Sequence, residues 1–385
     1  MPFLNSSNPK LQMLLLAVSS IALPSGLAAA PQISNVVLSA TGDVVIEGTG
    51  FGGGPTVAIH DDFSTARIES GSVSLSPQVG QWLIGNSSSQ SIVIDQKYQS
   101  KSLFVRGSGS SLFVFGIPDS TAPQGLRTFQ EVYMSYTIRD FGDFPGTGGT
   151  PTSFSTQSAT KDAWMMLGDR GDNTQYAVSQ GEASGHDLYI PGWTGTGFNI
   201  AGNNTRMEPS FWQGRLTENW DFGGWNTNMF HAELNPSNPY GKAEGFFSFI
   251  NENGYYSNVR NGNFMEDQRD EGVPYASWDR IKFFAWMNEG DANVRRVVDE
   301  IYVALGRNAN ARLLVTDNEK LGNSTRAFHL SPISWSGSEI VASFPDYLPD
   351  DNSYFVHVID ANNVASQGIG LCQRCPIAPE IFPVQ

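Results

Sequence analysis

The strand-like segment from Trp278 to Asn288 carries the residues best suited to contact a ligand. Alternate residues of a strand face opposite sides of a sheet, so this segment divides into two sets. The apolar set, which we expect in the core, comprises Ile281, Phe283, Ala285 and Met287. The other set holds aromatic rings and cations, and comprises Trp278, Arg280, Lys282, Phe284 and Trp286. Such rings stack on the C–H faces of sugars while neighbouring donors bond to hydroxyl groups. The pattern therefore predicts a carbohydrate-binding face, whereas tryptophans buried under loops are the alternative.

A second alternating segment, from Glu131 to Arg139, extends this prediction. Its core set comprises Val132, Met134, Tyr136 and Ile138. The opposite set comprises Tyr133, Ser135, Thr137 and Arg139. We expect Tyr133 and Arg139 to join the same binding face.

His231 and Glu233 share a face of the segment from Phe230 to Leu234, with Cβ atoms about 7 Å apart. A carboxylate beside an imidazole raises its pKa and fixes its tautomer, which suits a general base. In a β-eliminating lyase a His or Tyr removes the C5 proton and an Arg neutralises the uronate. Arg215 and Tyr255 are residues of these types. A solvated His–Glu pair on a surface strand is the other interpretation.

Cys372 and Cys375 form a CQRC sequence in a proline-rich tail. One such pair supplies half the ligands of a structural zinc site, so a local disulfide formed after export is the better interpretation. No cofactor is expected, except that acidic loops offer hard oxygen ligands for a structural Ca²⁺. Those loop residues are Asp169, Asp172, Asn173, Asp267 and Asp270. Solvated loops explain them equally well.

Charge and the first residues of the chain restrict partners and location. The 385 residues carry a net charge of −15, which argues against nucleic acid as the main partner because phosphate binding needs a basic face. Lys10, the apolar run Leu11 to Leu23 and the small residues before Pro31 are typical of a secretory signal peptide over residues 1–30. We therefore expect a secreted protein, extracellular or periplasmic. No other apolar stretch approaches the length of a membrane span.

The middle of the chain shows short alternating runs and turn clusters but hardly a helical pattern, which predicts an all-β protein. Residues 31–59 contain too few strands to bury a core, and three further alternating runs follow Ala311. We expect residues 31–59 and 311–368 to form one small sandwich. It would be split by a larger sandwich over residues 60–306, and a tail over residues 369–385 would follow.

The turn Gly48-Thr49-Gly50-Phe51-Gly52 and the later sequences SWSGSEIVASF and YFVHVIDANNVAS resemble the immunoglobulin-like IPT/TIG domain. The inserted segment is similar to the concanavalin A-like jelly roll of lectins, family 16 glycoside hydrolases and several polysaccharide lyases. That resemblance lies in DDF at residues 61–63, in RTFQEVYMSYTIR, and in the segment from Trp278 to Val303. It implies a jelly roll that binds glycans.

The acidic strand motif of family 16 hydrolases is missing from the sequence. We therefore expect an extracellular or cell-surface polysaccharide as the partner. A polysaccharide lyase or glycoside hydrolase that uses the same groove remains an alternative. A structural surface or matrix protein that binds other proteins is another.

Overall fold

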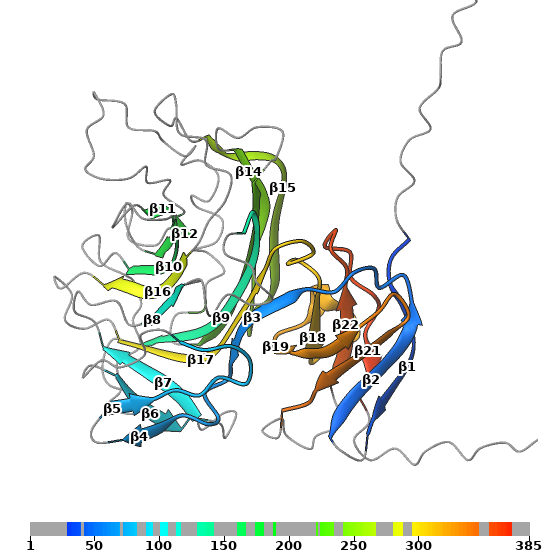
Figure 1. Cartoon of the computed structure of the whole chain (residues 1–385), viewed down its shortest axis with the longest axis horizontal. Helices are drawn as coiled ribbons and strands as arrows, with labels where there is room; N and C mark the ends of the chain where they lie inside the picture. The colour runs from blue at the N-terminus through cyan, green and yellow to red at the C-terminus, as the bar shows by residue number, and fades with distance from the viewer. Residues whose placement is uncertain are drawn as a thin grey trace, which may run out of the picture.

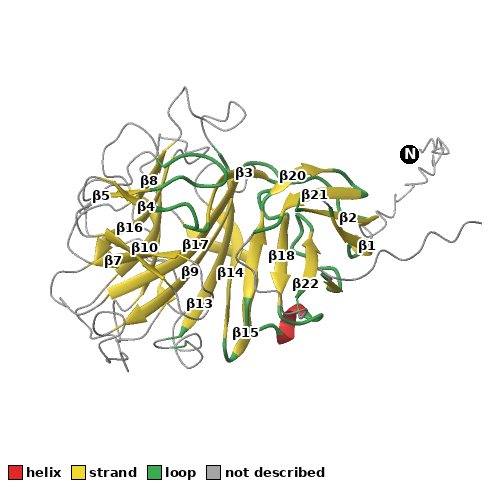
Figure 2. Ribbon diagram, turned by 90° about the horizontal axis from the view of Figure 1, so that it is seen from below, coloured by secondary structure: helices red, strands yellow, loops and turns green. Residues whose placement is uncertain are grey.

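The computed structural model describes residues 29–39, 42–69, 72–82, 90–94, 101–106, 113–116, 129–141, 160–166, 174–180, 188–189, 221, 224–234, 242–266, 280–287, 295–345 and 354–371. Within these ranges the regular structure is β-strand apart from one 3-10 turn, Leu321–Asn323 (Figure 2). The protein is therefore all-β, as the alternating pattern predicts. No helix in the described ranges is long and apolar enough to cross a bilayer.

Two antiparallel sheets form a sandwich that we call the small lobe (Figure 1). One sheet has the order β1-β2-β21-β20, with bounds Gln32–Leu38, Asp43–Thr49, Glu339–Ser343 and Pro332–Trp335. The other has the order β19-β18-β22-β23, with bounds Ala327–Leu330, Arg312–Thr316, Phe355–Ile359 and Ile369–Gly370. Buried apolar side chains from both sheets, such as Val44, Ile340, Leu313 and Val356, form one core between them.

The pairing of β2 with β21 joins two segments that are far apart in the sequence. Val44 lies opposite Ala342 and Ile46 opposite Ile340, which is the pairing expected between the early strands and the segment after Ala311. The chain leaves the small lobe near Gly53 and returns to it near Asn308. These two points lie together, because a Cβ at Gly53 would come within 2.5 Å of the Asn308 amide. A long insertion costs little when its two ends are this close.

The strands between these crossings form what we call the large lobe. Its larger sheet has eight strands in the order β15-β14-β13-β9-β17-β7-β6, with β3 also pairing with β17. In that order the bounds are Gly254–Glu266, Lys242–Asn251, Trp225–Leu234, Glu131–Phe141, Arg295–Leu305, Lys101–Arg106 and Gln90–Ile94, and β3 is Thr56–Asp61.

The second sheet of the large lobe has the order β12-β11-β10-β16-β8. Its bounds are Leu188–Tyr189, Thr174–Gln180, Thr160–Met166, Arg280–Met287 and Phe113–Gly116. A separate hairpin joins β4, Arg67–Glu69, to β5, Ser72–Ser74. Phe283 of β16 contacts Tyr136 of β9 and also Trp82, so the two sheets face each other across an aromatic core.

The strand β9 is buried on both faces. Val132, Met134, Tyr136 and Ile138 are buried as alternation predicts. The opposite face is also covered, and Tyr133 and Ser135 have no exposed surface. The reason is that the small lobe packs on this face of the eight-stranded sheet. Tyr133 and Tyr302 share a buried cluster there with Leu314, Ala327 and Ile359 of β18, β19 and β22.

Candidate functional site

The strand β16 carries three of the predicted ligand-binding residues. Arg280, Lys282 and Trp286 occupy positions that alternate with Ile281 and Phe283, and both of these are fully buried as predicted. In the register with β10, Lys282 lies opposite Trp164 and Trp286 lies opposite Lys161. The fold therefore places a tryptophan and a lysine of β10 beside β16, and a register shift between Lys161 and Ala163 interrupts the alternation between the two pairs. Neither was recognised from sequence, because register between distant strands is not visible there.

Several predicted residues lie outside the described ranges. They are Trp278, Arg215, Cys372, Cys375 and the candidate calcium ligands Asp169, Asp172, Asn173, Asp267 and Asp270. Their roles stay predictions. In the described ranges, no three His, Cys, Asp or Glu residues are grouped so as to hold a metal ion.

The prediction that Tyr133 contacts a ligand at an open face is wrong. Its ring is fully buried between the lobes, with the Arg312 guanidinium 4.6 Å above the ring centre. Its hydroxyl lies 3.0 Å from Nε2 of His329. Arg139 is half-buried at the far end of β9, opposite Trp225. Both residues belong to the eight-stranded sheet, so the fold separates them from the face on β16.

The structure pairs His231 with the carboxylate of Glu131, a partner that the sequence did not suggest beside Glu233. His231 Nε2 lies 3.2 Å from Oε1 of Glu131, its diagonal neighbour on β9. Glu131 also accepts backbone N–H groups of Asn308 at 3.0 Å and Asn310 at 3.3 Å, where the chain returns to the small lobe. The His231–Glu131 pair thus anchors this crossing. Glu233 is exposed, and Tyr255 packs half-buried at the edge of the interlobe cluster.

A buried carboxylate lies between two histidines where the lobes meet. Glu300 of β17 is 1% exposed, and its Oε1 lies 3.2 Å from His60 Nε2 of β3. Its Oε2 lies 3.0 Å from His329 Nδ1, and Oε1 also accepts the His329 backbone N–H at 2.9 Å. A register shift between Val298 and Glu300 interrupts the alternation of β17 here. The sequence signal that could have pointed to this site is Glu300 itself, a charged residue within the mostly apolar run VVDEIYVAL.

The three groups hold different charges. Burial alone raises the pKa of Glu300, but the adjacent imidazoles, His329 first, bring it down to about 2. Burial opposes protonation of His60, yet the hydrogen bond and charge of Glu300 leave its pKa raised. Burial dominates at His329 and lowers its pKa. These shifts favour the ionised form of Glu300, the protonated form of His60 and a neutral His329, which accepts the Tyr133 O–H at Nε2.

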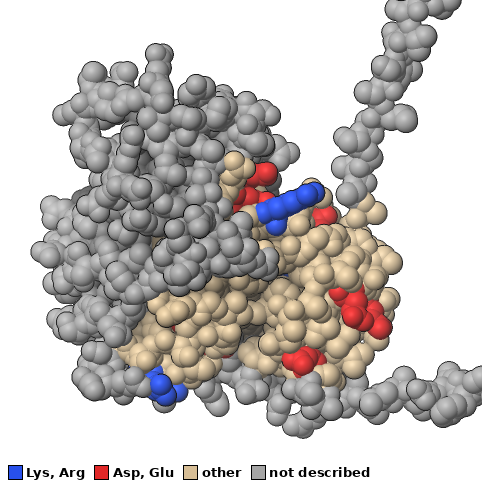
Figure 3. Space-filling view, in the orientation of Figure 1, with Lys and Arg blue, Asp and Glu red and all other residues tan. Residues whose placement is uncertain are grey.

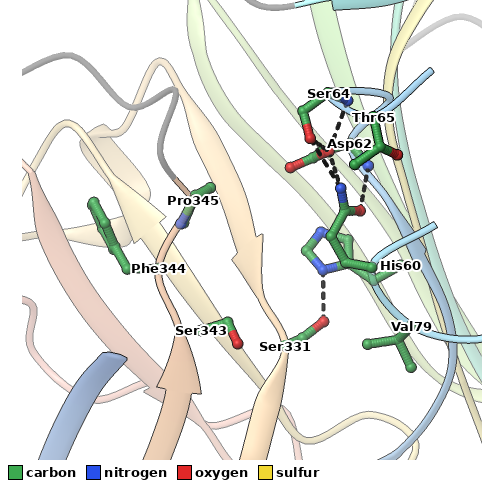
Figure 4. A pocket seen from close by; sticks show the side chains of 10 residues that line it. His60, Asp62, Ser64, Thr65, Val79, Ser331, Ser343, Phe344 and Pro345 are labelled. Carbon is green, nitrogen blue, oxygen red and sulfur yellow. Dashed lines mark hydrogen bonds between the residues drawn. The ribbon is translucent and has the colours of Figure 1, made fainter. Parts of the chain in front are cut away.

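A cavity of about 560 Å³ opens beside His60, between the lobes (Figure 4). The large lobe contributes His60, Asp62, Ser64, Thr65, Gln78 and Val79 to its lining. The small lobe contributes Ser331, Ser343, Phe344 and Pro345. Ser331 Oγ lies 2.6 Å from His60 Nδ1, so the cavity wall is tied to the buried network. On the face drawn in Figure 3, the described surface shows no cluster of Lys and Arg.

Comparison with known proteins gives only distant likenesses. No protein-family model and no curated protein matches the chain. Trypanosoma rangeli sialidase is a similar solved structure, with 11% identity and a TM-score of 0.35 over 65% of this chain and 30% of that chain. The PL-14 alginate lyase from Aplysia kurodai has 11% identity and a TM-score of 0.32 over 56% of this chain and 87% of its own. Alginate lyase vAL-1 from Chlorella virus has 10% identity and a TM-score of 0.32 over 66% and 94%. The match spans about a third of the sialidase chain.

Proposed function

We propose that this chain is a secreted polysaccharide-binding protein whose binding face lies on β16 and β10. The observation that carries the proposal is the register of these strands, which sets Lys282 opposite Trp164 and Trp286 opposite Lys161. Residues directly opposite each other share a face of the sheet. Lys282 and Trp164 therefore share one face, and Arg280 lies two residues before Lys282, while the Lys161–Trp286 pair lies beyond a register shift between Lys161 and Ala163.

The spacing along β16 suits an extended ligand. Lys282 and Trp286 are four residues apart, which is about 13 Å along a strand. A face of this length offers contacts to several linked sugar rings. The chain carries a net charge of −15, but a local group of cations dominates within the Debye length of about 8 to 10 Å. Sugars with or without acidic groups therefore fit this face.

The remaining parts of the proposal concern the domains and the location of the protein. We propose an IPT/TIG-like small lobe from residues 31–59 and 311–368, and a concanavalin A-like large lobe from residues 60–306. The pairing of β2 with β21 supports this division. Export directed by residues 1–30, followed by their removal, accords with the signal-peptide pattern.

Affinity electrophoresis in gels that contain polysaccharides tests the binding face. Trp286→Ala and Trp278→Ala should each weaken retention by about 1 to 3 kcal/mol if each ring stacks on a sugar. Ile333→Ala is the matched control, because this side chain is 61% exposed on β20 of the small lobe. Unchanged retention of both tryptophan variants, each shown to be folded, would remove β16 from the proposal.

A separate assay distinguishes binding from turnover. His231→Ala should leave retention intact, since His231 contacts Glu131 at the crossing between lobes and lies in the other sheet from β16. The wild-type chain should release neither new reducing ends nor unsaturated uronate. Turnover by the wild type that is lost in His231→Ala would favour the lyase or hydrolase alternative.

A further inference from the structure

We propose that the cavity between the lobes is a second carbohydrate site, which holds a single neutral sugar unit. This inference takes the class of ligand from the proposed function, but its site is separate from the face on β16. The volume of about 560 Å³ lies within the range of small-molecule sites. Because both lobes line the cavity, a bound sugar would bridge them.

Asp62 supplies the polar centre of this cavity. The residue is 6% exposed, and its Oδ1 accepts hydrogen bonds from Ser64 N at 2.9 Å and Ser64 Oγ at 2.6 Å. Gln78 Nε2 also donates to Oδ1, and Gln78 Oε1 accepts the Asp62 N–H at 3.0 Å. These contacts fix the carboxylate. Within the described part of the chain, Oδ2 accepts no hydrogen bond, and Figure 4 shows one carboxylate oxygen of Asp62 directed away from the dashed hydrogen bonds.

The opposite wall suits the other face of a sugar. Pro345 is half-buried and gives this wall an apolar ring, whereas the Phe344 ring points away from Asp62 in Figure 4 and packs against the small-lobe core. The Ser343 hydroxyl also lines the cavity and makes no hydrogen bond to other described residues. A carboxylate oxygen on one wall and a hydroxyl beside the Pro345 ring on the other would bind hydroxyl groups of the sugar and hold its ring between them.

Charge selects neutral ligands over anionic ones. Among the described residues that line the cavity, Asp62 is acidic and there is no Lys or Arg. The other titratable group is His60, whose two ring nitrogens are occupied by Glu300 and Ser331. The imidazole of His60 thus faces Glu300 and Ser331, while the carboxylate of Asp62 lines the cavity. A uronate would meet this carboxylate with a like charge.

Isothermal titration of the full chain tests the site, with D-glucose, D-galactose, D-mannose and N-acetylglucosamine as neutral probes. D-glucuronate, Ca²⁺ and tetramethylammonium serve as charged probes. We expect at least one neutral sugar to bind better than all three charged probes. Asp62→Asn should lower the affinity for that sugar about tenfold or more, because the substitution removes a charge-assisted hydrogen-bond acceptor. Ser343→Ala should lower this affinity about threefold or more, and this variant keeps the buried network intact.

Two controls separate this site from the face on β16. Glu339→Gln removes an exposed carboxylate from β21 and should leave sugar binding unchanged. Trp286→Ala should lower polysaccharide retention but leave the titration of the single sugar unchanged. The inference is overturned if no neutral sugar binds, if a charged probe binds best, or if the Asp62 and Ser343 variants, shown to be folded by circular dichroism, bind as wild type does. If Trp286→Ala leaves polysaccharide retention unchanged while the single sugar still binds in the titration, the proposal for β16 is refuted and the inference about the cavity is not.

Discussion

Replacing Glu300 with Gln should destabilise the protein more than any single change on its surface. The carboxylate is 1% exposed and accepts three hydrogen bonds, from His60 Nε2, His329 Nδ1 and the His329 backbone N–H. An amide keeps one oxygen acceptor but turns its NH₂ group toward an imidazole N–H. The charge that stabilises protonated His60 is lost at the same time.

The size of the effect follows from these contacts. A hydrogen bond to a charged group contributes about 1.5 to 3 kcal/mol, and removal of one partner from a buried ion pair costs about 3 to 5 kcal/mol. We therefore expect Glu300→Gln to lower the free energy of unfolding by about 3 to 5 kcal/mol. Because His60 and Glu300 lie in the large lobe and His329 in the small lobe, the loss should weaken the contact between lobes.

Urea unfolding at pH 7, followed by tryptophan fluorescence, measures this change. Glu339→Gln makes the same substitution at an exposed position and should stay within about 0.5 kcal/mol of wild type. A loss below about 1 kcal/mol in Glu300→Gln would refute the argument that the carboxylate is ionised and holds the two histidines.

Two further predictions concern buried charged groups. Burial raises the pKa of Asp61 from its usual 3.8 to about 6, although Trp82 Nε1 donates to its carboxylate at 2.7 Å. The stabilisation that the protonated Asp61 carboxyl contributes is complete below pH 3.8 and is lost as the pH rises through about 6. Between pH 7.5 and pH 4, the free energy of unfolding of wild type, measured with urea, should therefore rise by about 2 to 3 kcal/mol relative to that of Asp61→Asn. A difference between the two proteins that does not change with pH would contradict this. Arg312 is 1% exposed and lies over the Tyr133 ring with both Nη atoms bonded to oxygens. Arg312→Lys loses this planar fork and should cost about 2 kcal/mol or more in thermal unfolding, whereas an unchanged midpoint would show that the stack contributes nothing.

Alternation predicted which face of a strand is apolar, and that part of the fold follows directly from the sequence. Ile281 and Phe283 are buried on β16, and Val132 and Met134 are buried on β9. Alternation cannot say what covers the opposite face. Tyr133 illustrates this, because a whole second lobe packs on its side of the sheet.

The buried network was not predicted, because its members come from three distant strands. His60 follows a Gly-rich turn, Glu300 lies in an apolar run and His329 lies in AFHL. Each was visible as a polar residue inside a buried strand, but the pairing of β3 with β17 brings His60 to Glu300, and the contact between lobes adds His329. His231 shows the same limit, since its partner Glu131 lies on the neighbouring strand and Glu233 lies on its own.

Binding of the purified wild-type chain to an array of extracellular and cell-surface polysaccharides tests the central claim most directly. We expect the chain to be retained on at least one polysaccharide and to be displaced by the same polysaccharide in solution. A chain that is folded, binds no polysaccharide on the array and binds a matrix protein instead would contradict it.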